Sequence, residues 1–265
     1  MYPPNKWLKE VIMNITLEQY ILNPQLKSNA VLNATAREAI RGNYKQKYDA
    51  IMVRERGRLD YILYKDSKNN RYFAYFKIPS ETIEKFYYDV VLEFFADENV
   101  KKTNDLFSYY VKFYSNDPAF VYTHVYSFRA NDLFISELSS KMSKKALRTE
   151  AKEKNPYNQI GYVKTIYFAY LTMKNKSLNN LEKFNAEAST YSKISLLSHI
   201  MNADNKVGDR EAAGAKLQKT KKKQKEKTNS EIATKLVKNT LGIKKTKVIN
   251  SGIKNTKYVK NTKRK

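Results

Sequence analysis

LDYILYKDSKNNRYFAYFKIPS, residues 59–80, carries the strongest structural signal in the chain. Residues 59–64 and 72–78 are apolar runs rich in β-branched and aromatic side chains, which favour strands. DSKNN, which lies between the two runs, consists of residues that commonly form turns. The segment therefore predicts a β-hairpin, whose second strand ends at Pro79.

The residues that follow this hairpin have the features of a helix. Ser80 is a good helix N-cap, and Glu81 and Glu84 fall in the first turn, where acidic side chains suit the helix dipole. We expect a helix over 81–96. Its wide apolar stripe consists of Ile83, Phe86, Tyr87, Val90, Val91, Phe94 and Phe95.

A second hairpin is predicted downstream. Residues 107–114 form one strand, SNDP at 115–118 forms the turn, and residues 120–128 form the other strand. Two hairpins joined by a helix predict an α+β fold, with a four-stranded antiparallel sheet packed against helices.

Helical patterns occur at five further places: 5–22, 30–50, 133–142, 160–174 and 178–201. Gly42 is expected to break the second of these helices, and the charged residues 143–158 are expected to form an exposed loop. The sequence thus predicts an α+β body over 1–201 and a linker over 202–215. The remainder, 216–265, is a lysine-rich tail that we call the basic segment.

Charge and aromatic residues are separated along the chain. The chain has 265 residues and a net charge of +24, and 18 of its 50 Lys and Arg residues lie in the basic segment beside two acids, Glu226 and Glu231. Of its 34 aromatic residues, Tyr258 alone lies there. Mutational drift in an A/T-rich genome would raise lysine and tyrosine content together, so it does not explain this separation. A segment of this composition is expected to be disordered and to bind a polyanion.

Two patterns in the basic segment favour nucleic acid, with DNA preferred, as the polyanion. KTKKKQKEK at 219–227 is a run of like charge, and a loose repeat follows as VKNTL at 237, IKKTK at 243, IKNTK at 253 and VKNTK at 259. Lysines can pair with phosphates while threonine hydroxyls bond to phosphate oxygens. A solubilising tail without a partner is the alternative. The candidate nucleic-acid-binding residues are Lys219, Lys221, Lys222, Lys223, Lys225, Lys227, Lys244, Lys245, Lys247, Lys263, Arg264 and Lys265.

Arg54, Arg56 and Arg58 are candidates in the body. On an extended segment, alternate arginines would point to one side and clamp a phosphate. The alternative is a solvated face neutralised by Glu55 and Asp60. The basic stretch 140–156 could continue the same surface or dock on another subunit; its cations are Lys141, Lys144, Lys145, Arg148, Lys152 and Lys154.

Catalytic motifs are absent from the sequence, which favours a protein that is not an enzyme. There is no cysteine, glycine-rich phosphate loop, serine elbow or carboxylate–histidine metal spacing, and no cofactor, metal or small-molecule substrate is expected. His124, on a predicted strand, and His199, at a helix end, are expected to be structural. A Mg²⁺-dependent nuclease is the enzymatic alternative, because Asp60 and Lys77 lie on the hairpin, but Tyr75 occupies the position where such a site needs an acid.

Further features concern partners and membranes. The sequence lacks an apolar run long enough to span a bilayer and a signal-peptide pattern, so we expect a soluble intracellular protein. The pairs Tyr87-Tyr88 and Tyr109-Tyr110 are expected to place one ring outward, where tyrosine suits protein interfaces, with base stacking as the alternative.

Two segments, YFAYFKIPSETIEKFYYDVVLEFF at 72–95 and NPYNQIGYVKTIYFAYLTMKNKSL at 155–178, resemble small virion or accessory proteins of tailed bacteriophages with A/T-rich genomes. The segment before the second, FVYTHVYSFRANDLFISELSSKMSKKAL, shares this resemblance. The likeness implies a structural or assembly protein of the head, connector or tail region. It would then reside in the virion, and in the host cytoplasm during assembly. Its body would contact other virion proteins or further copies of itself. A free nucleic-acid-binding factor in replication, transcription or packaging is the alternative.

Overall fold

The computed structural model describes residues 14–22, 34–96, 103–155 and 160–240. The chain divides into two compact units, residues 1–211 and 212–265. Within the described ranges it forms eight α-helices and one five-stranded sheet, so the predicted α+β class is confirmed.

The sheet has the strand order β4-β3-β2-β1-β5. Its strands are β1 (Tyr61–Asp66), β2 (Arg71–Pro79), β3 (Tyr87–Phe95), β4 (Tyr110–Ser115) and β5 (Ser189–Thr190). Neighbouring strands from β4 to β1 are antiparallel, whereas the two-residue β5 is parallel to β1. The sheet is therefore mixed and has five strands, where four antiparallel strands were predicted.

The predicted first hairpin is confirmed. β1 and β2 pair in register from Tyr61 opposite Phe76 to Asp66 opposite Arg71. The Asp66 carboxylate accepts a hydrogen bond from the backbone N–H of Asn69, and Asn70 adopts a positive φ of 50°, which asparagine tolerates better than most residues. The turn residues recognised in the sequence therefore do close the hairpin.

The predicted helix over 81–96 is wrong, because residues 87–95 form the strand β3. Ser80 Oγ does accept hydrogen bonds from the N–H groups of Thr82 and Ile83, but the local cap does not propagate into a helix. Every residue of β3 except the first and last is buried. A strand covered on both faces is apolar without alternation, and such a run also satisfies helical spacing.

The predicted strand over 120–128 is also wrong. A π-helical turn at Phe120–His124 continues into α4 (Val125–Ala130). The Asp117 carboxylate accepts a hydrogen bond of 2.8 Å from the N–H of Ala119, so Asp117 and Pro118 begin a helix rather than close a hairpin. The outer edge of β4 instead lies beside residues 15–16 and 133–135.

Several predicted helices differ in extent from the observed ones, whose bounds are α2 (Leu17–Leu22), α3 (Ala34–Arg54), α5 (Lys144–Arg148), α6 (Lys164–Asn175), α7 (Leu181–Glu187), α8 (Lys193–His199) and α9 (Ala203–Thr240). Gly42 does not interrupt α3, and the helix predicted over 178–201 is divided by β5 into α7 and α8. Residues 136–141 form a 3₁₀ helix, η4. The predicted loop 143–158 contains α5, and residues 5–13 of the first predicted helix lie outside the described ranges.

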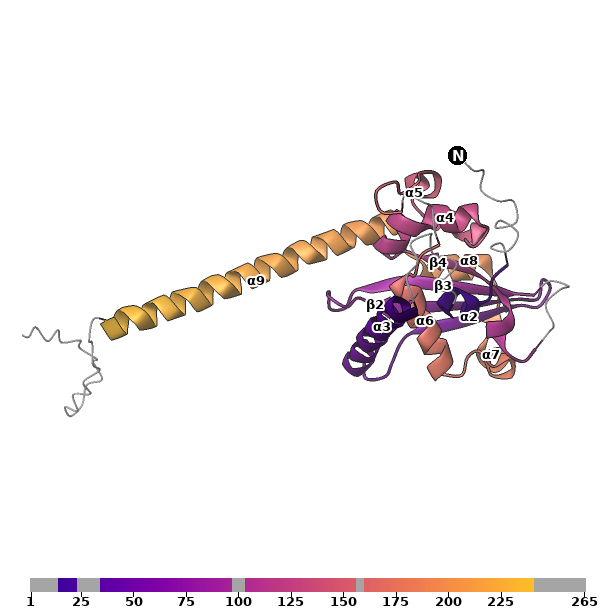
Figure 1. The fold of residues 1–265 in the computed structure, drawn as a ribbon, viewed down its shortest axis with the longest axis horizontal. Coiled ribbons are helices and arrows are strands. Elements are labelled where there is room, and N and C mark those ends of the chain that lie inside the picture. The colour runs from indigo at the N-terminus through magenta and orange to yellow at the C-terminus, as the bar shows by residue number, and fades with distance from the viewer. Residues whose placement is uncertain (1–13, 23–33, 97–102, 156–159, 241–265) are drawn as a thin grey trace, which may run out of the picture. The chain divides into compact units, whose positions relative to one another are not determined.

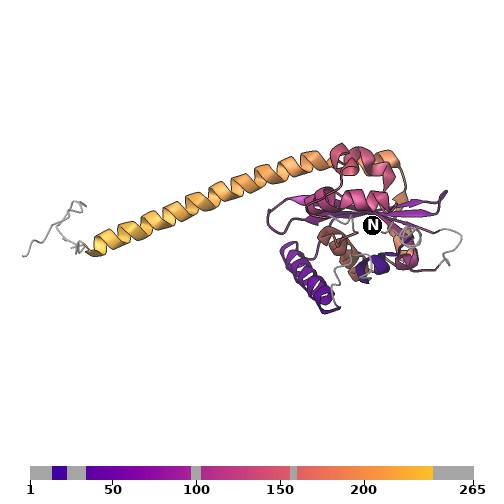
Figure 2. The same cartoon turned by 45° about the horizontal axis from the view of Figure 1, so that its top comes forward.

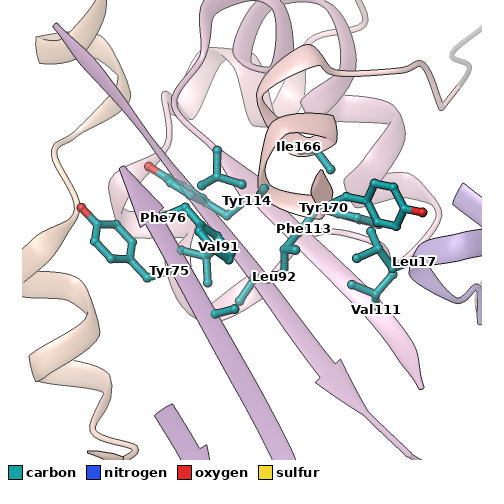
Figure 3. Packing of buried hydrophobic residues seen from close by; sticks show 14 of the residues in the cluster. Leu17, Tyr75, Phe76, Val91, Leu92, Val111, Phe113, Tyr114, Ile166 and Tyr170 are labelled. Atoms are coloured by element: carbon teal, nitrogen blue, oxygen red, sulfur yellow. The ribbon is translucent and has the colours of Figure 1, made fainter. Parts of the chain in front are cut away.

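Helices cover both faces of the sheet, with α3 and α6 on one side and α8 on the other (Figures 1 and 2). Leu92 pairs with Phe113 and points toward the side of α6, which contributes Ile166 and Tyr170 to the core (Figure 3). Val91 pairs with Tyr75 and Tyr114 on the opposite face, where the His199 ring at the end of α8 lies 5.7 Å from that of Tyr75. The centre of the sheet therefore has no solvent-exposed face.

Most of the predicted linker at 202–215 belongs to the first part of α9. Ala203 is fully buried, the Lys206 ammonium lies 4.7 Å from the centroid of the Phe86 ring, and the Arg210 guanidinium lies 5.8 Å from that of Tyr88. α9 continues through residues 216–240, where the sequence predicts disorder. Residues 241–265 lie outside the described ranges.

A buried carboxylate fixes the junction between α8 and α9. Asp89 of β3 is 4% exposed and accepts hydrogen bonds from Tyr75 Oη (2.8 Å), Asn116 Nδ2 (2.6 Å) and the backbone N–H of Met201 (3.0 Å). Three donors from separate parts of the chain thus share one acceptor. Asp89 therefore links the sheet to the residues that precede α9.

Replacing this acceptor should destabilise the first unit strongly. Asp89→Ala leaves two buried donors and one part-buried donor without this acceptor, so we expect the free energy of unfolding to fall by about 3 kcal/mol or more. Tyr75→Phe, which removes one donor and retains the carboxylate, should cost about 1–2 kcal/mol. Urea unfolding followed by circular dichroism measures both values. Equal, small losses would show that Asp89 does not organise this junction.

Candidate nucleic-acid interface

The part of α9 that lies in the second unit carries the densest positive charge in the described chain. Six lysines lie within residues 216–225, and all of them are exposed. Glu226 is the one acid within residues 216–228. The six lysines are Lys216, Lys219, Lys221, Lys222, Lys223 and Lys225.

These lysines repel one another along the helix. Lys219 and Lys223 are four residues apart, as are Lys221 and Lys225, and like charges at this spacing destabilise a helix by about 0.2–0.5 kcal/mol per pair. The hydroxyls of Thr220 and Thr228 donate hydrogen bonds of 3.0 Å to the carbonyls four residues earlier, so they do not offset this repulsion. A row of phosphates would neutralise the charge and stabilise the helix.

The predicted residues of the basic segment are only partly visible. Lys219, Lys221, Lys222, Lys223, Lys225 and Lys227 belong to α9. Lys244, Lys245, Lys247, Lys263, Arg264 and Lys265 lie outside the described residues, so their role stays a prediction. Sequence reasoning identified the cations of α9 from composition, but it did not identify their helical arrangement.

Arg54, Arg56 and Arg58 do not form the predicted clamp on an extended segment. They surround the C-terminus of α3, where the N–H of Gly57 bonds to the carbonyl of Met52 and the N–H of Arg56 bonds to that of Val53. This Schellman geometry places Arg56 and Gly57 at positive φ, 54° and 74°. All three arginines are exposed.

Arg54 already has partners within the first unit. Its guanidinium donates to the Ser80 carbonyl (2.8 Å) and to the carboxylate of Glu55 (2.9 Å). This pairing agrees with the alternative of a neutralised surface for Arg54. Arg56 and Arg58 remain candidate phosphate contacts.

The basic stretch 140–156 forms a surface of its own. Lys144, Lys145 and Arg148 on α5 are exposed, whereas Ala146 and Leu147 are buried. Beside α5 lies a pocket of about 180 Å³, whose lining includes Val121, Tyr122 and Lys145. The pocket is mainly apolar, which fits an apolar side chain better than a phosphate.

The residues considered for a nuclease do lie together. A groove of about 520 Å³ is lined by Asp60, Tyr75, Lys77 and His199 among others, and the N–H of Lys77 donates to the carbonyl of Asp60. Asp89 is the carboxylate bonded to Tyr75, but it is buried and already accepts three hydrogen bonds. Within the described ranges, no three His, Cys, Asp or Glu residues are grouped so that they could hold a metal ion.

Both histidines are packed against neighbours. His124 lies in the π-helical turn rather than on the predicted strand, and a Cβ at Gly161 would come within 2.2 Å of its ring. His199 is the last residue of α8, as the sequence predicts, and its ring stacks on that of Tyr75.

A small polar pocket of about 110 Å³, which sequence reasoning missed, is lined by residues that include Asp117, Lys164 and Arg210. Lys164 is paired with Glu81 at 2.9 Å, and burial raises the pKa of Asp117. Two cations face two acids, Glu81 and Asp117, so the pocket shows no excess of either charge. No local sequence pattern predicts this pocket, because its residues come from four separate parts of the chain.

Arg71 is surrounded by three carboxylates on the face of the sheet that α8 covers. It contacts Asp66 (2.9 Å), Glu93 (3.1 Å) and Glu137 (2.6 Å), and Tyr191 donates a hydrogen bond to Glu137. Burial raises the pKa of Glu93. Burial also acts to raise the pKa of Asp66 and Glu137, but hydrogen bonds outweigh it and the pKa of each lies below its usual range. At Asp66 these hydrogen bonds come from Asn69 and Arg71. At Glu137 they come from Tyr191 and Arg71. The network holds parts of the fold together and leaves no free cation there for a ligand.

The tyrosines are mainly core residues. Tyr88 and Tyr109 are 6% and 1% exposed, while their neighbours Tyr87 and Tyr110 are half-buried. The rings of Tyr87 and Tyr110, which were predicted to point outward, are therefore only partly exposed for contact with a partner. Tyr122, at 44%, is the one tyrosine among the described large apolar residues that stand out as exposed.

Comparison with known proteins assigns no family. The sequence matches no family model, and no curated protein or solved structure is similar enough to count as a match. No helix within the described ranges is sufficiently long and apolar to cross a membrane.

The Arg71 network gives a prediction about pH. A carboxylate whose pKa is lowered in the folded state contributes stability above its unfolded pKa of about 4, and this contribution is lost as the pH falls through the folded value. Arg71→Gln should lower the free energy of unfolding at pH 7 by about 3 kcal/mol, since it leaves three carboxylates without their cation.

Protonation should relieve that loss, so the difference between the variant and the wild type should shrink between pH 7 and pH 4. Arg71→Lys, which retains a positive charge, is the control and should show a smaller difference at pH 7. Urea midpoints measured across this range test the prediction. A constant difference between wild type and Arg71→Gln would show that the carboxylates do not depend on Arg71.

Proposed function

We propose that this protein is a non-enzymatic nucleic-acid-binding protein of the structural or assembly kind, in which α9 binds phosphates and the first unit contacts other protein copies. The observation that carries the proposal is the cluster of exposed lysines on α9, in a chain whose first unit uses its aromatic residues to fill a core. The proposal extends to the location that the resemblance to bacteriophage virion proteins implies, which is the phage particle and, during assembly, the host cytoplasm.

The chemistry of α9 supports binding to phosphates rather than to bases. Residues 203–240 contain no aromatic side chain on which a base could stack. Lysines that neutralise phosphates release bound counterions, which gives affinity without sequence recognition. DNA is the proposed ligand, and a small-molecule substrate, a cofactor and a membrane are not part of the proposal.

The buried acids of the first unit support a structural rather than a catalytic role. Asp89 accepts three hydrogen bonds, Glu93 is paired with Arg71, and Asp117 caps a helix. An active-site acid needs access to a substrate and a free proton-transfer partner. These three groups are instead used within the fold.

The edge of β1 supports contact between copies. The carbonyl of Asp60, just before β1, accepts a hydrogen bond from the N–H of Lys77 on β2. Because backbone groups alternate in direction along a strand, the odd-numbered residues of β1 direct theirs away from β2. The carbonyl of Lys65, for example, accepts a hydrogen bond from the N–H of Tyr191. β5 pairs at Tyr64 and Lys65, and no strand of the described chain lies beside Tyr61. Antiparallel pairing about Tyr61 would let two copies exchange identical hydrogen bonds across a two-fold axis.

The lysines of α9 should account for a measurable part of the salt dependence of DNA binding. If about eight phosphates are contacted, log affinity falls with log salt at a slope near −7. Replacing Lys219, Lys221, Lys223 and Lys225 with Gln should reduce the slope to about −4. Titration of a fluorescent DNA duplex at several salt concentrations measures both slopes.

The matched control removes the same charge from the basic stretch of the first unit. Lys144, Lys145, Lys152 and Lys154, all exposed, are replaced with Gln, and the slope should stay near that of the wild type. Equal effects of the two variants would indicate general attraction to a positive protein. An unchanged slope in the α9 variant would refute the assignment of DNA binding to α9.

Tyr61→Pro should weaken self-association without unfolding the protein. Proline removes an N–H that β2 does not use and blocks pairing at the edge. Tyr61→Phe, which retains the backbone N–H, is the control and should associate as the wild type does. Light scattering after gel filtration gives the masses, and thermal melts verify folding. A wild-type protein that is monomeric yet binds DNA would favour the free nucleic-acid-binding factor instead.

A further inference from the structure

The exposed lysines of α9 spread over an arc of about 220° around the helix and leave one sector without charge. At 3.6 residues per turn, Lys216 and Lys223 form a row at one edge of this arc, and a second row lies at the other edge, about 170° away around the axis. The second row consists of Lys221 and Lys225. A helix that binds a flat anionic surface needs one such row, so the second row calls for phosphates on both sides.

An uncharged sector separates the two rows. Leu217, Thr220, Gln224 and Thr228 follow one another at intervals of three or four residues and share one side of the helix. The two threonine hydroxyls donate to helix carbonyls, so each presents a methyl group and an oxygen acceptor. The opposite sector contains Ala215 and Glu226 together with Lys219 and Lys222. An acidic side chain there suits solvent rather than the interior of an anionic groove.

We propose that residues 216–228 of α9 lie in the major groove of double-stranded B-form DNA, with one lysine row on each phosphate backbone and the uncharged sector toward the base edges. This inference rests on the proposed function and specifies its ligand. It assigns the two lysine rows to two different DNA strands.

The dimensions of nucleic acids favour this ligand over others. The major groove of B-form DNA is about 12 Å wide and admits a helix about 10–12 Å across, whereas the minor groove is about 6 Å wide. A-form RNA has a deep, narrow major groove that side chains do not read, and a single strand provides one row of phosphates. Residues 216–228 span about 20 Å, roughly half a turn of DNA, a length over which a straight helix can follow the groove.

The uncharged sector limits what such a helix can recognise. Gln224 is its one side chain with an amide, and the threonines and Leu217 contribute mainly apolar contacts. Positioning therefore comes from the phosphates, and the base edges supply little discrimination. Such a helix coats duplex DNA without selecting a sequence, which suits a protein that covers packaged or assembling DNA.

The first test compares ligands on the full-length chain. A 30-base-pair DNA duplex, an RNA duplex of the same sequence and a single strand of the same DNA are titrated at one salt concentration. We expect the DNA duplex to bind at least tenfold more tightly than either alternative. Methyl green, which occupies the major groove, should compete with the protein, and netropsin, which occupies the minor groove, should not. Similar affinities for DNA and RNA duplexes would overturn the groove assignment.

The second test places the same negative charge on two sides of α9. Gln224→Glu puts a carboxylate in the uncharged sector, and Ala215→Glu puts one in the opposite sector; both positions are exposed. We expect Gln224→Glu to weaken binding to the DNA duplex at least tenfold and Ala215→Glu to weaken it no more than threefold. Equal losses would mean that the lysines act as a diffuse charge, which overturns the groove assignment and leaves nucleic-acid binding intact. Failure of the wild-type protein to bind any of the three nucleic acids would overturn the proposed function as well.

Discussion

Burial of β2 and β3 on both faces is the constraint on which the rest of the first unit depends. Phe76 and Leu92 point to one side of the sheet, Tyr75 and Val91 to the other, and all four are at most 1% exposed. Two layers of helices must cover these strands, which uses most of the aromatic residues as core. Contacts with partners are then left to strand edges, helix surfaces and α9. The same constraint explains why the acids at the centre of the sheet all have partners within the fold.

Asp89 connects this core to the beginning of α9. Its carboxylate holds the N–H of Met201, and Ala203, Lys206 and Arg210 then pack on the first unit. Starting a helix is costly, because several residues must be fixed for the first hydrogen bond, whereas adding residues to an existing helix is easier. An anchored first turn therefore lets α9 continue into residues whose lysines repel one another. In the proposed complex, the phosphates of the two DNA strands neutralise the lysine rows and so stabilise the helix over those residues.

Local patterns predicted some of this fold and misread other parts for identifiable reasons. The first hairpin was predictable, because two strand-forming runs flank turn residues whose side chains do bond to the turn. β3 was not, because Val90, Val91 and Leu92 are buried on both faces, and an unbroken apolar run fits a helix equally well. Asp117 and Pro118 suit a hairpin turn and a helix start alike, and the observed helix depends on packing that the local sequence does not reveal.

For the candidate site, too, the sequence predicted some features and missed others. Composition alone identified the lysines of the basic segment, because charge there is separated from aromatic content. The helix that arranges them was missed, since its first turn is fixed by Asp89, Phe86 and Tyr88, which lie more than 100 residues earlier in the chain. The arginines around Gly57 were misplaced because alternation implies a common side only in an extended segment, and this segment ends a helix.

We infer that α9 extends from a stable core and that phosphates stabilise its cationic residues. Amide hydrogen exchange on the full-length protein, with and without duplex DNA, tests it most directly. We expect slow exchange in β2 and β3 under both conditions, and slow exchange over residues 216–228 when DNA is bound but not when it is absent. Strong protection of residues 216–228 without DNA, or no change when DNA is saturating, would contradict it.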